Sequence, residues 1–328
     1  MKRSPKTVQE ESFEVQYTQE GERLDKVLSE IYPDFSRSFF QKLIKNKQIQ
    51  VNGAVQKASY PVHTEDLIRV TIPDAVETTI EPENIPLDIL YEDDDVLIVN
   101  KPKGMVVHPS AGHYSGTLVN AIMYHCKDSL SGINGQIRPG IVHRIDMDTT
   151  GSLIVCKNDE SHVNIAEQIK EHTVNRIYVG IVCGNVTEDE GTIEGAIGRH
   201  PVDRKKMAVN EKNGKPAITH YKVLERFGNY TYMQFQLETG RTHQIRVHMA
   251  SLGHPLLGDS LYCLSDISNP FSRAALHAWK LKFQLPFSID ESASDTRASM
   301  HHDKNAKKEI SLEAPLPEDF KKFYETIF

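Results

Sequence analysis

The stretch "HRIDMDTTGSLIV", residues 143–155, places a histidine, an arginine and two aspartates directly before an apolar segment. Residues 152–156 are mostly Leu, Ile and Val, which is typical of a strand buried on both faces. Asp146 should therefore lie where this strand begins. Because burial disfavours the ionised form of a carboxyl group, a charge held there needs a cation from elsewhere in the chain.

A second group of charged residues, "RTHQIRVH", lies at 241–248. Its apolar spacing predicts a helix that begins near Thr242 and turns Ile245 toward the interior. Arg246 would then project at the interior edge of the domain, within reach of Asp146. Arginine suits this pair because it stays protonated and can hydrogen-bond both oxygens of a carboxylate.

The composition is that of a globular protein. A chain of 328 residues with a hydrophobic fraction of 39% is long enough for two domains. No apolar run approaches the roughly 20 residues that a membrane-spanning helix requires. The four cysteines are scattered, which is typical of reduced structural thiols. We expect a cytoplasmic protein that does not contact a membrane.

The formal net charge of -7 disfavours a nucleic-acid partner, because polyanion binders usually carry an excess of Lys and Arg. The distribution along the chain, however, is uneven. Residues 35–57 contain five basic side chains and no acid, whereas residues 74–95 contain acids and no base. A basic module therefore precedes an acidic connector.

The basic module has the pattern of a small domain over residues 13–72. The expected elements are helices at 23–32 and 37–48, a strand at 49–53 that ends in an Asn-Gly turn, and a strand at 67–73. A basic surface on the second helix, suited to phosphates, should be formed by Arg37, Lys42, Lys45 and Lys47. The proline-bearing acidic stretch 73–86 is expected to be an extended linker.

The second domain should span residues 87–328. Strands are expected at 96–104, 151–158, 174–184, 218–227 and 230–239, and helices at 117–126 and 161–172. In the second of these helices the spacing of Val163, Ala166 and Ile169 predicts the buried face. Many strands with few helices favour an α+β fold, in which helices pack on a mixed, largely antiparallel sheet. The polar segment 287–308 is expected to be a mobile loop.

Two parts of the sequence resemble known families. The module over 13–72 resembles the S-four-type, or alpha-L, RNA-binding domain through "RLD" at 23–25, "SR" at 36–37 and "VNG" at 51–53. The stretches 143–157 and 239–259 are similar to the two central motifs of the RluA/RluD-type pseudouridine synthases. This likeness extends from about Arg23 to the closing "LEAPLPEDF", so a chance match of one motif is excluded.

The resemblance implies isomerisation of uridine to pseudouridine in RNA without a cofactor or metal. By motif position Asp146 would act as a nucleophile or as the base that removes a ribose proton, with Arg246 as its partner. The Arg-x-Tyr pattern at 176–178 implies that Tyr178 stacks on the target uracil, although a strand tyrosine is more commonly a packing residue. Arg144 would support the target nucleotide after it swings out of the RNA.

Further substrate contacts are expected from His143, Arg241 and Ile245, and from a basic loop that contains Arg199, Arg204 and Lys205. For His143 an equally good alternative is a hydrogen bond to the backbone of its own turn. A monomer that binds large-subunit ribosomal RNA is expected from the likeness to the RluD branch.

Three alternatives stay open: a non-catalytic RNA-binding ribosome-assembly factor, a tRNA-directed synthase, and a metal hydrolase built on His243, His248, His254 and Asp259.

Overall fold

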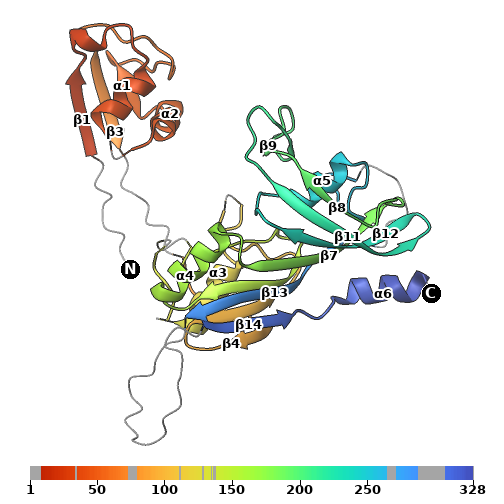
Figure 1. The fold of residues 1–328 in the computed structure, drawn as a ribbon. Helices are drawn as coiled ribbons and strands as arrows, with labels where there is room; N and C mark the ends of the chain where they lie inside the picture. Colours follow the sequence, from red (N-terminus) through yellow and green to blue (C-terminus); the bar gives the residue numbers. More distant parts are fainter. Residues whose placement is uncertain are drawn as a thin grey trace, which may run out of the picture. The chain divides into compact units, whose positions relative to one another are not determined.

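The computed structural model describes residues 9–33, 35–72, 80–110, 112–127, 129–133, 135, 138–263, 271–286 and 307–327. It divides into two compact units, Met1–Thr78 and Thr79–Phe328, which we describe separately (Figure 1). Most of the expected loop at 287–308 lies outside the described residues. Among the described helices, none is long and apolar enough to cross a membrane.

The first unit packs two helices on a small antiparallel sheet. Its elements are β1 (Gln9–Glu14), a short 3-10 turn η1 (Tyr17–Gln19), α1 (Leu24–Ile31), α2 (Arg37–Lys45), β2 (Ile49–Val51) and β3 (Leu67–Ile72), and the strand order is β1-β3-β2. The helices share one core with the sheet, in which Leu28, Phe40 and Ile68 are fully buried. Ser36 begins α2 by accepting a hydrogen bond from the Phe39 N–H.

The predicted basic surface on α2 is partly wrong. Arg37 is half-exposed, but its Nη2 donates to Oδ1 of the buried Asp25 at 2.9 Å. Burial favours the neutral acid, yet hydrogen bonds from Arg23, Arg37 and Gln41 hold the pKa of Asp25 well below its usual range. Lys47 lies beyond the end of α2, in a left-handed turn with φ +62°. Arg37 is therefore committed to an ion pair within the domain.

In the second unit, the described residues form a sheet of nine strands. These are β4 (Ile89–Glu92), β5 (Val96–Lys101), β6 (Thr150–Cys156), β7 (Asn175–Cys183), β8 (Glu190–Glu194), β11 (Ile218–Phe227), β12 (Tyr230–Leu237), β13 (Leu276–Pro286) and β14 (Lys307–Glu313). The order is β4-β5-β6-β13-β7-β12-β11-β8, and β14 pairs with β13. Only the β6–β13 pair among these strands is parallel. The predicted α+β fold with a mixed, largely antiparallel sheet is confirmed.

Helices cover both faces of this sheet. On one face, α3 (Leu118–Cys126) and α5 (Gln244–Ser251) share a core with β6 and β7 that includes Leu153 and Tyr178. On the other face, α4 (Asp159–Lys170) packs on Ile154, and α6 (Glu318–Ile327) packs on Val179. The alternation along β6 and β7 thus sends Tyr178 to the face that carries α5.

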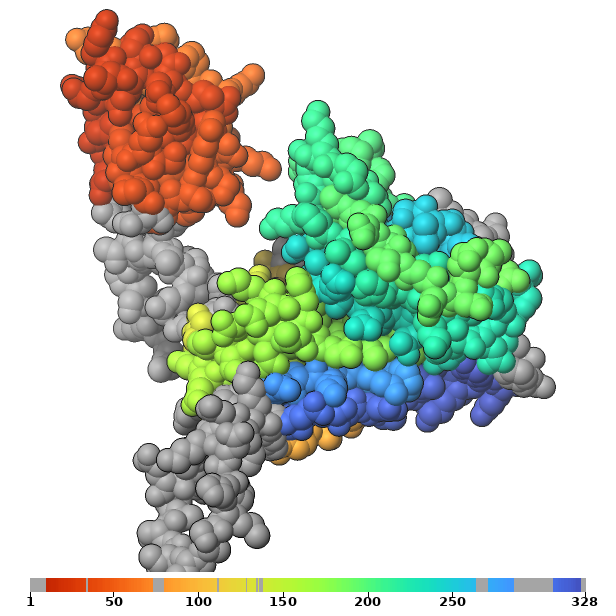
Figure 2. Space-filling view, viewed as in Figure 1, coloured from red at the N-terminus to blue at the C-terminus, as the bar shows by residue number. Residues whose placement is uncertain are grey.

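Two further strands form a separate hairpin, β9 (Ile197–Arg199) with β10 (Met207–Val209). This hairpin stands out from the body of the second unit, and Figure 2 shows it as a projecting lobe. It contains the basic loop that the sequence indicates.

The predicted buried face of α4 is partly wrong. Ile169 packs against the core as predicted, but the fully buried apolar residue of α4 is Ile165, whereas Val163 is 58% exposed. Gln168 is also on the buried side, and both ends of its side-chain amide hydrogen-bond the backbone of Gln284 in β13. A polar residue therefore takes part in the buried face, which a search for apolar spacing does not detect. The helix α5 begins at Gln244, close to the position that the sequence predicts.

The expected linker is also too long at its second end. Ile80 is buried in the core under α3, Glu81 O accepts from the Asn120 side chain, and the Glu83 N–H donates to Asn120 O. Residues 80–86 therefore belong to the second unit, and residues 73–79 lie outside the described chain.

Candidate active site

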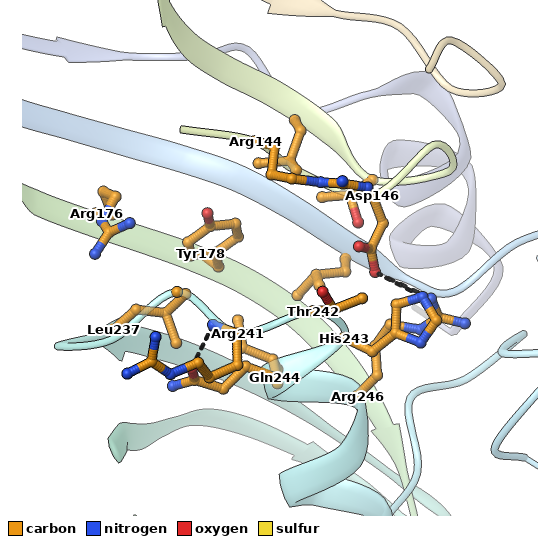
Figure 3. Close-up of a pocket in the computed structure, with 15 residues that line it drawn as sticks. Arg144, Asp146, Arg176, Tyr178, Leu237, Arg241, Thr242, His243, Gln244 and Arg246 are labelled. Atoms are coloured by element: carbon orange, nitrogen blue, oxygen red, sulfur yellow. Dashed lines mark hydrogen bonds and ion pairs between the residues drawn. The ribbon is translucent and has the colours of Figure 1, made fainter. Parts of the chain in front are cut away.

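A pocket opens on the face of the sheet that carries α5 (Figure 3). Its wall comes from the segment before β6, from β7, and from the turn that joins β12 to α5. The charged residues of the wall are Arg144, Asp146, Arg176, Arg241 and Arg246. Asp146 and Arg246, which are 100 positions apart in sequence, are thus brought to one hollow by the sheet order.

The loop that carries Asp146 is held by two buried cations. The Nζ of Lys101, which is 1% exposed, donates to the carbonyl oxygen of Met147 at 2.8 Å and to two carbonyls of its own turn. Arg273 donates to the Asp148 carbonyl at 3.1 Å. The loop closes with a hydrogen bond from the Thr149 N–H to the Asp146 carbonyl at 3.1 Å. Backbone contacts therefore fix the place of Asp146 before any side chain acts.

Gly151 permits the chain to leave this loop. Its φ is +111°, and a Cβ at this position would lie 2.2 Å from the Ala278 carbonyl oxygen of β13. Only glycine combines this backbone conformation with so close a neighbouring strand.

The structure brings Asp146 and Arg246 together. Arg246 Nη1 lies 3.0 Å from Asp146 Oδ2, and the Asp146 side chain is 20% exposed at the pocket (Figure 3). From the described residues, the Asp146 carboxylate receives this one side-chain hydrogen bond, and it is made to Oδ2. A carboxylate that lines a pocket and has one oxygen without such a bond can act as a nucleophile or as a base.

The expected two-pronged contact of Arg246 is made with a different acid. Arg246 Nε and Nη2 donate to the two oxygens of Asp259 at 2.7 and 2.8 Å, while Asp146 receives one hydrogen bond. The Asp259 side chain is fully buried. Burial works against the charge of Arg246, but the hydrogen bonds and charge of Asp259, followed by those of Asp146, raise the pKa of Arg246 above its ordinary value. Asp259 thereby positions the guanidinium for Asp146.

His243 also faces Asp146. It precedes α5 in the left-handed conformation with φ +58°, and its Nε2 is 3.9 Å from Asp146 Oδ2. Its Nδ1 is 2.9 Å from the hydroxyl of Tyr262, which in turn accepts the Met207 N–H at 2.8 Å. That hydroxyl can donate its proton to Nδ1, and in this arrangement the proton of a neutral imidazole lies on Nε2.

The neutral form of His243 is favoured by its surroundings. Burial lowers the pKa of His243, an effect that the charge of Asp146 opposes and that of Arg246 reinforces. With Nδ1 as the acceptor from Tyr262, the neutral ring places an Nε2–H beside the Asp146 carboxylate. Tyr262 also covers Arg246, with the guanidinium carbon 5.1 Å from the ring centroid.

We predict that Tyr262→Phe lowers the turnover rate about fivefold, the effect of losing roughly one hydrogen bond. The phenyl ring would still cover Arg246, while the tautomer of His243 would no longer be fixed. Steady-state rates over a range of pH measure this change. The wild-type rate should be constant near neutral pH, where His243 is neutral, whereas the rate of the variant should vary with pH there. A turnover rate and pH profile equal to those of the wild type would contradict the assignment.

Tyr178 lies on β7 at the floor of the pocket and is 6% exposed (Figure 3). Burial raises the pKa of its hydroxyl, and the charge of Arg176 opposes this shift. A neutral aromatic ring at the floor, beside a carboxylate, suits a planar base.

The other predicted residues occupy different positions. Arg144 is exposed on the wall, Ile245 is buried beneath it, and Arg241 is half-buried with its Nε donating to the Pro216 carbonyl at 3.0 Å. His143 lies outside the pocket. Its Nε2 accepts the Ile154 N–H at 3.0 Å, and burial lowers its pKa to about 3. His143 thus contacts backbone, as the alternative reading expects, but the contact is to strand β6 and not to its own turn, and His143 is not among the residues that line the pocket.

The basic loop also lies away from the pocket wall. Arg204 and Lys205 are exposed between β9 and β10, and the Arg199 guanidinium donates to the Arg204 carbonyl at 3.0 Å. The hairpin connects to the pocket through the Met207 contact with Tyr262.

The sequence does not single out Tyr262, and it includes Arg176 only as the arginine of the Arg-x-Tyr pattern, without a role of its own. It gives His243 and Asp259 a role only as metal ligands. In the structure, the proposed metal ligands have other hydrogen-bond partners. Asp259 binds Arg246, His248 binds Thr219, and His254 binds the Cys183 carbonyl. Among the described residues, no group of three His, Cys, Asp or Glu side chains could hold a metal ion. The proposed hydrolase ligands therefore do not converge.

Comparison with known proteins agrees with the sequence motifs and the geometry. The model of the RNA pseudouridylate synthase family matches residues 95–251, and that of the S4 domain matches residues 22–68. An uncharacterized RNA pseudouridine synthase of Bacillus subtilis is 46% identical over 309 residues, which cover 94% of this chain and 95% of that protein. The ribosomal large subunit pseudouridine synthase D of Pasteurella multocida is 40% identical over 329 residues, or 96% and 94% of the two chains.

A solved structure shares the fold. Human RNA pseudouridylate synthase domain containing 1 superposes with a TM-score of 0.51 at 24% identity, covering 75% of this chain and 96% of that one. The identity and coverage of the bacterial relatives decide the family. The chain belongs to the RluA-type RNA pseudouridine synthases, which are isomerases, and it carries an N-terminal S4 RNA-binding domain.

Proposed function

We propose that the protein isomerises specific uridines of large-subunit ribosomal RNA and that Asp146 performs the chemistry. The observation that carries this proposal is the hydrogen bond of 3.0 Å between Arg246 and one oxygen of Asp146, at a pocket floored by Tyr178. Within an RNA pseudouridine synthase, this arrangement supplies a carboxylate held by a guanidinium to a ribose whose base lies on an aromatic surface.

The reaction must break the N1–C1′ bond of uridine and form a C5–C1′ bond. An oxygen of the Asp146 carboxylate either attacks C1′ or takes the proton from C2′, and the uracil leaves with the N1–C1′ electron pair. The uracil then rotates above Tyr178 and rejoins the ribose through C5. In the first route C5 displaces the Asp146 oxygen from C1′, and in the second Asp146 returns its proton to C2′, so the free carboxylate is regenerated. The hydrogen on C5 leaves as a proton and N1 takes up a proton, so the atoms balance without a cofactor. Arg246 holds the Asp146 carboxylate in place by its hydrogen bond of 3.0 Å.

The remaining wall residues fit the handling of a displaced nucleotide. We propose that exposed Arg144 supports the flipped nucleotide, that Arg241 binds its backbone, and that Ile245 packs against the base. Arg199, Arg204 and Lys205 of the hairpin would contact RNA farther from the reacting atoms. His143 is left out of this set, because its ring is bound to β6.

Large-subunit rRNA is favoured over tRNA by the relatives that carry the name ribosomal large subunit pseudouridine synthase D, with identities of 39% to 44%. The S4 domain supports a structured RNA as substrate.

The test is to map pseudouridines in rRNA and tRNA from cells that lack the gene. We expect at least one rRNA pseudouridine to be missing, to return with the wild-type gene, and to stay absent with Asp146→Asn. A missing tRNA pseudouridine instead would redirect the substrate to tRNA. A position restored by Asp146→Asn would favour a non-catalytic assembly factor, and unchanged maps would reject the proposal.

We predict that neutralising Lys42, Lys45 and Lys47 to glutamine weakens RNA binding and lowers the slope of log Kd against log salt by roughly 2 to 3. These three side chains are exposed on or just beyond α2. Filter binding of an rRNA fragment at several salt concentrations measures the slope. Lys26→Gln on α1 is the control, because Lys26 is already paired with Glu22 and Glu30. An unchanged slope in the triple variant would contradict the role of this surface.

A further inference from the structure

Arg176 is a buried cation to which the described residues offer one long hydrogen bond and no carboxylate. It lies on β7, is 6% exposed, and forms part of the pocket wall. Its Nη2 makes one long hydrogen bond of 3.5 Å to the Glu238 carbonyl, and its Nε has no partner. Among the described residues, no carboxylate forms an ion pair with it.

A second buried arginine among the described residues of this unit shows what a structural role requires. Arg273, 4% exposed, donates two hydrogen bonds to the carboxylate of Asp319 and three to backbone carbonyls. Burial of a guanidinium is strongly unfavourable unless such acceptors are present. Arg176 has the burial of Arg273 without its acceptors. A ligand in the pocket must therefore provide them.

The position of Arg176 identifies which part of the ligand it meets. Residues 176 and 178 are two apart on β7, so their side chains lie on the same face roughly 7 Å apart along the strand. In Figure 3, Tyr178 stands between Arg176 and Asp146, and both charges act on its hydroxyl. A uracil stacked on Tyr178 with its ribose at Asp146 directs the edge that is remote from the ribose toward Arg176.

That remote edge distinguishes uracil from cytosine. Uracil has a carbonyl acceptor at C4, whereas cytosine has an amino donor there. A guanidinium has only hydrogen-bond donors, so it can bind the C4 carbonyl of uracil but finds no acceptor in the C4 amino group of cytosine. A phosphate of the RNA backbone fits the position of Arg176 less well. Backbone phosphates stay in contact with solvent at the mouth of a pocket, whereas Arg176 is only 6% exposed.

We propose that Arg176 donates hydrogen bonds to O4 of the target uracil and thereby makes the enzyme select uridine over cytidine. This inference rests on the proposed function, in which Asp146 receives the ribose. Sites that hydrogen-bond a substrate group reject analogues that lack it, because their own buried polar groups are then unpaired.

The experiment is a cycle of one protein change and one atom change in the RNA. The probe is an rRNA fragment that contains the mapped uridine, together with the same fragment carrying 2-pyrimidinone ribonucleoside, which lacks O4, or cytidine at that position. The Asp146→Asn substitution is used so that the RNA is bound but not converted. The affinity of this variant for each fragment is compared with that of the double variant Asp146→Asn/Arg176→Met.

We expect Arg176→Met to weaken binding of the uridine fragment by roughly 10- to 100-fold, the range for a hydrogen bond that involves a charged group. Binding of the 2-pyrimidinone and cytidine fragments should change less than threefold, because the atom that Arg176 contacts is absent. An equal loss for all three fragments would overturn the assignment and point to a phosphate contact. No loss for any fragment would overturn it as well.

Thermal unfolding separates this role from a structural one. Removal of an unpaired buried charge should leave the Tm of Arg176→Met equal to or above that of the wild type, whereas Arg273→Met, the matched control, should lower it. A fall in Tm for Arg176→Met as large as that for the control would overturn the proposal. A wild-type protein that leaves the mapped uridine unmodified would reject the proposed function itself, while normal uridine conversion by Arg176→Met would reject only the inference about Arg176.

Discussion

Asp146→Asn should reduce the rate of pseudouridine formation by at least roughly 10⁴-fold, the scale on which enzymes lose activity without their nucleophile or base. An amide has nearly the shape of the carboxylate and can still accept the hydrogen bond from Arg246, which is 3.0 Å away. Arg246 also keeps its neutralising partner Asp259, to which it makes two hydrogen bonds. The variant should therefore fold, bind RNA and fail at the chemical step.

Release of tritium from uridine labelled at C5 measures this step directly, because formation of the C5–C1′ bond displaces the C5 hydrogen. Asp148→Asn is the matched control, since Asp148 is on the same loop but does not line the pocket. The control should lose less than about threefold. An Asp146→Asn enzyme within tenfold of the wild type would remove Asp146 from the mechanism.

Arg246→Lys should lower the rate by roughly 10²- to 10³-fold, the usual effect of removing one preorganised electrostatic contact. A single ammonium group cannot span both oxygens of Asp259 and also reach Asp146, three contacts that the guanidinium makes at 2.7 to 3.0 Å. Lysine nevertheless retains the positive charge, so buried Asp259 stays compensated. Arg246→Met lacks this compensation and should destabilise the fold by about 3 to 5 kcal/mol.

Comparison of these two variants separates charge from geometry. Single-turnover rates with saturating RNA should be low for Arg246→Lys while its Tm stays near that of the wild type. Asp259→Asn should give a smaller loss of rate, because the guanidinium still contacts Asp146 but is less firmly held. Wild-type turnover in Arg246→Lys would show that the orientation of Arg246 does not matter to the reaction.

Patterns of apolar residues predict the second unit well where the elements are buried on both faces. The run at 152–156 indicates β6, every residue of which is buried in the structure. The meeting of Asp146 with Arg246 is also predictable, because each lies beside an apolar element that must enter the same core. Such inferences depend on the hydrophobic effect, which acts over whole segments.

The polar details were not predictable in the same way. Asp259 follows the sequence "GHPLLG" and has the pattern of an ordinary turn, yet it is the main partner of Arg246. Arg37 is in a run of basic residues but pairs with Asp25, which belongs to another helix. These contacts depend on the distances between helices and strands in the folded chain. Those distances cannot be read from a single sequence. The side of α4 that is buried was missed because Gln168 packs inward.

The arginine-lined pocket wall has a consequence for how the protein meets its substrate. The wall carries four arginines and one aspartate, a formal charge of four less one, or +3, on a chain whose formal charge is -7. An RNA that approaches such a protein in a random orientation meets a repelling, negatively charged surface in most cases and the attracting pocket wall in few. Productive encounters should then be selected by electrostatic steering during diffusion, and raising the ionic strength should increase the share of misaligned collisions.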